Sequence, residues 1–253
     1  MNIGLNGLCF LTKQQQLDQK ILKEIERLPE EDRLATLTAL ERYNREGVRS
    51  KYWTEPEKLI RFIRNQQLFK NSGEVVDLGA GPGDLVEELA REYPRKRICG
   101  IDLSSEFVGS FNSNRAQRLP NATMDVGLID QPRSIGSKNR ASVISVLTLD
   151  RVSNPAILIE NMAKYSKSRV LATLLPIIGE DDNPSLQAEG TKRVYTPPAK
   201  RIVPGRRADE DRGALMTLLQ KSWKKPIAYS EVEYVVNSSG DRQEYTLGVF
   251  FTS

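Results

Sequence analysis

The chain has 253 residues, of which 39% are hydrophobic and 28% are charged. This length and composition are typical of a folded globular protein, exclude a disordered or fibrous chain, and favour one main domain over two independent ones. The 37 Lys and Arg against 33 Asp and Glu leave a net charge of +4, which suits an anionic substrate without requiring one.

The chain contains no histidine and only two cysteines, Cys9 and Cys99. Two thiols without histidine form neither a disulfide framework nor the usual zinc sites, so we predict a protein of the reducing cytoplasm without a bound metal. Ser-His and Cys-His nucleophile pairs are excluded as well. Any acid or base catalysis must therefore use a carboxylate, lysine, tyrosine or water.

Residues 1–70 are predicted to form a helical extension. Apolar residues recur at three- and four-residue steps between 14 and 27, and Pro29 opens a second helix. Thr54 is expected to cap a third helix that has Pro56 in its first turn. These helices would either cover a substrate pocket or form the contact of a homodimer, and periodicity does not separate the two. The start of the chain has no basic segment before its short apolar run, so neither a signal peptide nor a membrane anchor is expected.

From residue 71 to 253 the pattern predicts one α/β domain. Short apolar runs alternate with helical stretches, which indicates a doubly wound, mostly parallel sheet with helices on both faces. After a last helix, expected from Gly213 to Trp223, two further runs indicate a closing antiparallel hairpin. The parallel strands are expected at 74–78, 97–103, 122–128, 141–149 and 169–175, and the hairpin at 227–236 and 244–251.

A long insertion interrupts this alternation after the fifth strand. Residues 176–211 hold five prolines, three glycines and many charges, so they are predicted to form a lid-like loop rather than core. The insertion follows a parallel strand, at the edge where open α/β sheets bind their ligands.

A glycine cluster carries the strongest chemical signal. Gly79, Gly81 and Gly83 follow the first strand of the domain and precede a helical stretch. Such glycines let the backbone approach a nucleotide-like ligand, and the helix start offers unpaired amides. Asp102 ends the next strand, where an acid can accept hydrogen bonds from both ribose hydroxyls. A dinucleotide dehydrogenase is the rival interpretation, but its fingerprint requires a small residue where this chain has Asp84.

Three segments together resemble one family. VVDLGAGPGDL at 75–85, ICGIDLS at 98–104 and ASVISVLTLDRVSNP at 141–155 are similar to segments of the class I S-adenosylmethionine-dependent methyltransferases. The resemblance covers about residues 74–176. It implies a Rossmann-like, seven-stranded sheet whose last strand is antiparallel, with S-adenosylmethionine as cofactor and methyl transfer as activity.

The resemblance also implies the cofactor contacts. Asp77 and the glycine loop would hold the methionine end, and Asp102 with its neighbour would hold the ribose. Many relatives place an acid against the adenine amino group where this chain has Gly127, so Asp125 is the candidate for that contact, with the backbone at 127 and 128 as the alternative. Val146, Leu147 and Thr148 would form a wall beside the cofactor, although a buried strand needs apolar residues in any case. The predicted cofactor-binding residues are Asp77, Gly79, Ala80, Gly81, Gly83, Asp102, Leu103, Asp125, Gly127, Leu128 and Val146.

The acceptor side carries weaker signals. Asp150 is the candidate catalytic residue, because methyltransferases commonly place substrate-facing groups after the fourth strand; a solvated ion pair with its neighbour Arg151 is an equal alternative. The aromatic pair before the third helix could be a lid or a hydrophobic staple, and the basic insertion could bind an acceptor or be a solvated loop. The candidate substrate-binding residues are Tyr52, Trp53, Arg151, Tyr195 and Arg206.

The function predicted from these features is methyl transfer to a small-molecule acceptor. The sulfonium methyl is already activated, so alignment and exclusion of water suffice, without a covalent enzyme intermediate. Acids at 209–211 compensate the basic residues before them, which disfavours nucleic acid as a partner. The alternatives are an RNA or protein methyltransferase, and a non-catalytic protein that binds S-adenosylmethionine or a partner.

Overall fold

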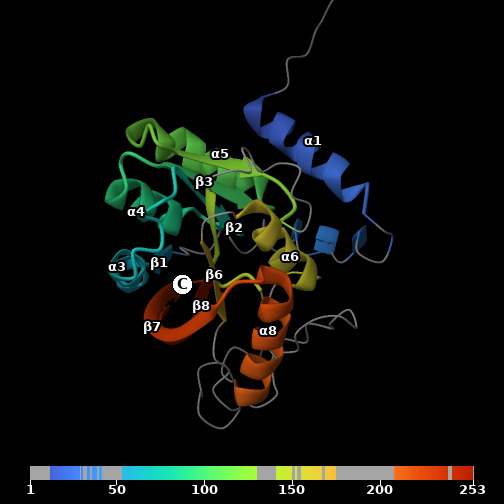
Figure 1. The fold of residues 1–253 in the computed structure, drawn as a ribbon. Coiled ribbons are helices and arrows are strands. Elements are labelled where there is room, and N and C mark those ends of the chain that lie inside the picture. Colours follow the sequence, from blue (N-terminus) through green and yellow to red (C-terminus); the bar gives the residue numbers. More distant parts are fainter. Residues whose placement is uncertain are drawn as a thin grey trace, which may run out of the picture.

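The computed structural model of the chain describes residues 12–28, 53–129, 141–149, 155–166, 169–174, 208–238 and 241–252, with residue 152 and some positions between 30 and 41. These residues form one sheet with helices packed on both faces (Figure 1). The predicted doubly wound α/β fold is therefore confirmed. No helix in these ranges is both long and apolar enough to cross a bilayer.

The sheet has eight strands in the spatial order β1-β7-β8-β6-β5-β2-β3-β4. The five strands β2 to β6 are parallel to one another, and β8 runs antiparallel to β6. The strands are β1 (Trp53–Glu55), β2 (Glu74–Leu78), β3 (Arg97–Asp102), β4 (Ala122–Val126), β5 (Ala141–Ser145), β6 (Val170–Leu174), β7 (Ile227–Ser238) and β8 (Asp241–Thr252).

The strand order reverses between β2 and β5. The chain passes from β2 to β3 and β4 on one side, and then crosses to β5 and β6 on the other side. Helices that follow these two groups cannot cover the carboxyl ends of β2 and β5, so open α/β sheets have a ligand crevice at such a point. The loop after β2 therefore lies where the fold offers space for a ligand.

Two layers of helices bury the two faces of the sheet. One apolar core contains buried residues of α1, α3, α4 and α5, and a second contains those of α6 and α8. Each helix presents its apolar side to the sheet, as in α4, where Leu85, Val86 and Leu89 are buried. The helices are α1 (Lys13–Ile25), α3 (Glu57–Asn65), α4 (Asp84–Glu92), α5 (Ser105–Asn114), α6 (Pro155–Tyr165) and α8 (Ala208–Trp223), with a 3-10 turn at Ala116–Arg118.

Helix α1 starts with a capping box. The Thr12 hydroxyl accepts from the Gln15 amide at 3.2 Å, and the Gln15 side chain accepts from the Thr12 amide at 2.8 Å. Ile21 and Ile25 are each 1% exposed and belong to the same core as α4 and α5. The first predicted helix is thus confirmed, and it packs within the chain against α5 and the edge strand β4.

The expected helical extension contains a strand, which corrects the prediction for residues 1–70. Trp53–Glu55 pairs antiparallel with β7 and adds an eighth strand to the seven expected. Thr54 consequently does not cap α3, whose first residue follows Pro56 without a side-chain cap. A three-residue strand has no detectable periodicity, so its partner strand decides its conformation.

The predicted insertion at 176–211 overlaps the next helix at its carboxyl end. Helix α8 begins at Ala208 and not at Gly213, so residues 208–211 are helical. Residues 175–207 lie outside the described part of the chain. The predicted hairpin is confirmed, and its strands are longer than expected because β7 and β8 pair along twelve residues each.

Candidate functional site

The glycine loop between β2 and α4 has a left-handed backbone at three positions. Gly79, Gly81 and Gly83 have φ of +80°, +55° and +87°. Other residues reach these values only with strain, so the sequence needs glycine here to turn directly from strand into helix. The amides of Gly79 and Ala80 donate to the Ile101 carbonyl, at 2.8 and 3.1 Å, which ties the loop to the end of β3.

The three glycines differ in what surrounds them. A Cβ at Gly79 would lie 2.5 Å from the Thr148 side chain, and one at Gly83 would overlap Phe111 and Met124. At Gly81 a Cβ would meet no atom within 4 Å. Gly79 and Gly83 are therefore required by packing, whereas Gly81 borders open space at the centre of the loop.

Asp102 lies at the end of β3 beside this space. Its Oδ2 accepts from the Gly81 amide at 2.7 Å and its Oδ1 from the Ser104 amide at 2.8 Å. The side chain of Ser104 in turn caps α5. A carboxylate can accept about four hydrogen bonds, so Asp102, held in place by two amides, can also accept from hydroxyl groups of a ligand.

Asp77 is the least satisfied acid of the site. It is 2% exposed, and within the described part of the chain its Oδ1 has no hydrogen-bond donor. Burial, and to a lesser degree the neighbouring Asp102 carboxylate, raise the pKa of Asp77 to about 8. A buried carboxylate in this state is stabilised by a cationic donor such as an amino group.

The end of β5 forms the opposite side of the loop. Leu147 has φ of +57°, an uncommon conformation for a non-glycine residue, and its amide donates to Thr173 Oγ1 at 3.0 Å. The Thr148 hydroxyl donates to the Val146 carbonyl at 3.0 Å and lies 3.4 Å from the carbonyl oxygen of Gly79. Thr148 thus contacts the loop directly. Thr148 is one of the three residues, with Val146 and Leu147, that the sequence pattern assigned to this wall, although Val146 alone was predicted to bind the cofactor.

Together these residues suit an adenosyl amino acid. A ligand amino group would satisfy the unpartnered oxygen of Asp77, vicinal hydroxyls would donate to the Asp102 carboxylate, and the open space at Gly81 lets a ligand approach the backbone. S-adenosylmethionine carries all three features. The donor set therefore fits this cofactor.

A family model described as a methyltransferase domain matches residues 69–193. The matched segment contains β2 to β6 and the whole glycine loop. The chain belongs to the class I S-adenosylmethionine-dependent methyltransferases. S-adenosylmethionine is the cofactor of this family.

One curated relative matches a short part of this methyltransferase. It is a trans-aconitate 2-methyltransferase of Afipia carboxidovorans, 40% identical over 50 residues. The match covers 20% of this chain and 18% of that protein, so less than a fifth of the relative is represented.

Solved structures share the fold at low sequence identity. A magnesium protoporphyrin IX methyltransferase from Synechocystis PCC 6803 with bound S-adenosylmethionine is 15% identical, with a TM-score of 0.51, over 97% of this chain and 99% of that one. An O-methyltransferase family protein from Burkholderia thailandensis is 18% identical, with a TM-score of 0.52, over 95% of this chain and 70% of that one. These likenesses show the fold.

The predicted adenine contact takes a different form in this methyltransferase. Asp125 pairs in register with Ile101, and its neighbour Val126 pairs with Asp102. Side chains alternate along a strand, so Asp125 points to the other face of the sheet from Asp102. At this edge strand it forms an ion pair with Lys20 of α1 at 2.7 Å. Its adenine role stays a prediction, which this placement does not favour.

The backbone at residues 127 and 128, which was the alternative adenine contact, also makes hydrogen bonds. The Gly127 amide donates to the Asp102 carbonyl at 3.0 Å, so residues 127 and 128 lie directly beside the ribose-binding position. The Leu128 amide donates to Oε2 of Glu24, at 3.0 Å. Glu24 belongs to α1 and was not predicted from the sequence, because its partner lies 104 residues away.

Asp84 has a structural role that explains why it replaces the small residue of the dehydrogenase fingerprint. Its Oδ2 accepts from the Thr54 amide at 2.8 Å, and its Oδ1 pairs with Arg115 at 2.6 Å. The carboxylate therefore joins β1, α4 and α5.

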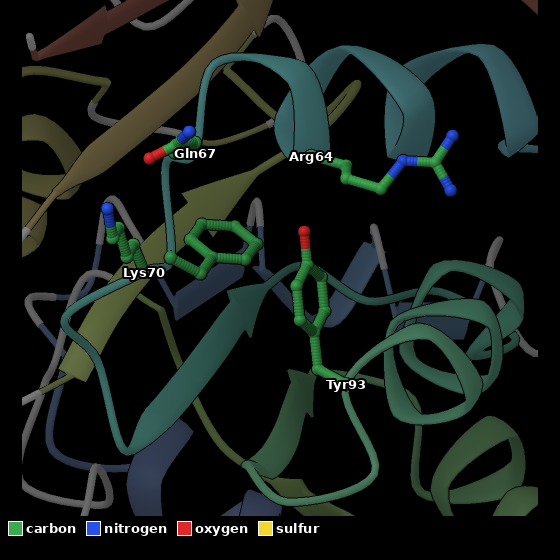
Figure 2. A pocket seen from close by; sticks show the side chains of 5 residues that line it. Arg64, Gln67, Lys70 and Tyr93 are labelled. Carbon is green, nitrogen blue, oxygen red and sulfur yellow. The ribbon is translucent and has the colours of Figure 1, made fainter.

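A separate cavity of 310 Å³ lies at the opposite end of the sheet (Figure 2). Phe69 and Lys70 precede β2, and Tyr93 follows α4, so the cavity lies beside the amino ends of the strands. This position is remote from the glycine loop at the carboxyl ends and excludes the cavity as the cofactor site. It is lined by Arg64, Gln67, Phe69, Lys70 and Tyr93.

The acceptor-side predictions fall largely outside the described residues. Tyr52, Asp150, Arg151, Tyr195 and Arg206 all lie there. The backbone of Trp53 is described as the first residue of β1, which is a strand and not a helix start. The roles predicted for these six residues stay predictions.

Proposed function

We propose that the chain transfers the methyl group of S-adenosylmethionine to a small-molecule acceptor. The observation that carries the proposal is the cluster at the strand-order reversal: the unpartnered oxygen of Asp77, the carboxylate of Asp102 and the open space at Gly81. Together these features support binding of the cofactor in a single orientation, with its amino acid near β2 and its ribose near β3.

The cofactor supplies an activated methyl group, and the chain supplies alignment. Asp77 would neutralise and orient the amino group, Asp102 would hold the ribose, and Gly81 would permit close approach of the backbone. Holding the cofactor at these three points would keep its methyl group in one position, so an acceptor bound next to it would react through proximity. No covalent bond to the protein is required.

An anionic small molecule is the acceptor class we favour. The curated relative is named for trans-aconitate, a small carboxylate, and a neighbouring structure is named for magnesium protoporphyrin IX. The net charge of +4 makes association with an anion favourable. Tyr195 and Arg206 are the candidates for one flat and one cationic contact.

The test is a transfer assay with radiolabelled S-adenosylmethionine. The purified chain is incubated with panels of small carboxylic acids, RNA and peptides, and labelled products are identified by mass spectrometry. We expect product from a small acid with the wild type, and none with Gly81→Val. Transfer to RNA or peptide alone would contradict the proposed acceptor class. Cofactor binding without transfer to any panel would favour a binding protein.

A further inference from the structure

Helix α1 brings a carboxylate to the place where the end of β4 lacks one. The strand ends next to Gly127, which has no side chain to offer a ligand. The Gly127 amide donates to the carbonyl of Asp102, so the adjacent Leu128 lies one step beyond the ribose-binding acid. A base joined to a ribose at Asp102 would therefore lie within reach of residues 127 and 128.

Glu24 is held at this position by its contact with the backbone. Its Oε2 accepts from the Leu128 amide at 3.0 Å, and among the described residues its Oε1 accepts no hydrogen bond. The side chain is half-buried. One oxygen is thus anchored, and the other is available to a donor in the same plane.

Three further contacts fix α1, so that Glu24 does not depend on its own bond alone. Lys20 pairs with Asp125 at 2.7 Å, Ser105 donates to Asp18, and Ile21 is fully buried in the core. Helix α1 packs next to α5, and it also contacts the edge strand β4 (Figure 1). The helix is docked by both polar and apolar contacts, which keeps a carboxylate on it in a defined place.

We infer that Glu24 is the specificity residue for adenine, its Oε1 accepting a hydrogen bond from the exocyclic 6-amino group. The inference rests on the proposed use of an adenosyl cofactor. A carboxylate at this point favours a 6-amino purine, which donates, and disfavours a 6-oxo purine, whose oxygen would face the negative charge. No other carboxylate among the described residues contacts the amide of Leu128.

The test compares two ligands that differ only at position 6 of the purine. Dissociation constants of S-adenosylhomocysteine and S-inosylhomocysteine are measured by calorimetry for the wild type and for Glu24→Gln. The variant keeps a carbonyl oxygen for the Leu128 amide but presents an NH2 group in place of Oε1. We expect the wild type to prefer the adenosyl ligand by about tenfold or more, and the variant to lose or invert that preference.

Two matched variants separate recognition from docking. Glu26→Gln makes the same charge change at an exposed position of the same helix end, and should leave the preference unchanged. Lys20→Met removes the ion pair with Asp125 and should alter both affinities by the same factor. Thermal unfolding of each variant confirms that it is folded.

Each result has a distinct consequence. Failure of the wild type to bind S-adenosylhomocysteine would overturn the proposed function together with this inference. Binding with an unchanged adenosyl preference in Glu24→Gln would overturn the inference alone. Equal weakening of both ligands in that variant would also overturn it, since Glu24 would then only dock the helix.

Discussion

Asp77 couples the stability of the free protein to pH. Burial raises its pKa to about 8, whereas an aspartate in the unfolded chain titrates near its ordinary pKa of 3.8. Between these values the folded state holds the proton and the unfolded state does not, so stability falls as pH rises from about 4 to 8. This loss of stability comes from the buried negative charge of Asp77, which the amino group of a bound cofactor would neutralise.

We predict that Asp77→Asn abolishes this pH dependence. The amide carries no charge, so the melting temperature of the wild type relative to the variant should drop between pH 5 and pH 8, by at least roughly 2–4 °C. Differential scanning calorimetry without ligand measures the difference. If the melting temperatures of the two proteins changed with pH in the same way, Asp77 would already be ionised in the folded protein, and the prediction would be wrong. The variant should also bind S-adenosylhomocysteine more weakly.

The glycines at 81 and 83 should respond differently to substitution. Gly81→Val places its side chain in open space but strains the left-handed backbone, so it should cost some stability while the protein still folds and its affinity for S-adenosylhomocysteine falls by at least about tenfold. Gly83→Ala strains the backbone and also forces a Cβ into Phe111 and Met124, so it should lower the melting temperature more. Calorimetric titration and thermal unfolding of both variants test this contrast, and unchanged affinity in Gly81→Val would contradict the assignment of the loop.

At the scale of elements, Asp84 joins three of them. It accepts from the backbone of β1 and pairs with Arg115 at the end of α5, and its side chain is 12% exposed. In the sequence, this residue served only to exclude a dinucleotide fingerprint. In the structure, a charge that would repel pyrophosphate stabilises the packing around the loop.

Asp84→Ala should therefore destabilise the protein without a matching loss of cofactor affinity. Removing the acceptor leaves the Thr54 amide without its partner and Arg115 with Glu87 alone, at about 2 kcal/mol, or roughly 4–8 °C in melting temperature. Glu88→Ala on the same helix removes only a surface ion pair with Arg91 and should cost less than about 1 kcal/mol. Similar melting temperatures for the two variants would contradict the role of Asp84.

At the scale of the molecule, β1 closes one edge of the sheet. It pairs with residues 235–237 of the twelve-residue strand β7, whose backbone groups at these positions would otherwise be unpaired along that edge. Arg242 of β8 pairs with Glu55 at 3.2 Å, and the Tyr234 hydroxyl donates to Thr54 at 3.1 Å. An unpaired long edge is a template for association with other chains, so the short strand protects the protein from it.

Glu55→Pro should expose this edge. The Thr54 amide points to Asp84, so in the antiparallel ladder the amide of Glu55 faces β7, and proline removes it. We expect concentration-dependent association in light scattering. Glu55→Ala, which removes only the ion pair with Arg242, should stay at the size of the wild type. Identical behaviour of both variants would mean that β1 does not protect the edge.

The sequence by itself determined the domain and the centre of the site. Periodicity of two or 3.6 residues is a local property, so the order of strands and helices from residue 74 onward followed from it. Gly79, Gly81 and Asp102 could be placed together because the carboxyl ends of adjacent parallel strands lie at one edge. The lack of histidine is a property of composition alone, and it was enough to exclude whole classes of catalysis.

Only the tertiary structure decided what depends on distant partners. Trp53–Glu55 becomes a strand because β7 offers an edge, and Leu147 adopts a left-handed backbone beside Thr173. Asp125 was chosen by strand position, yet Lys20 engages it from α1, while Glu24 reaches Leu128 across 104 residues. A local pattern states which face of an element is apolar, but not which polar group meets it. That pairing is set by how the elements pack, where burial and hydrogen bonding act over long sequence separations.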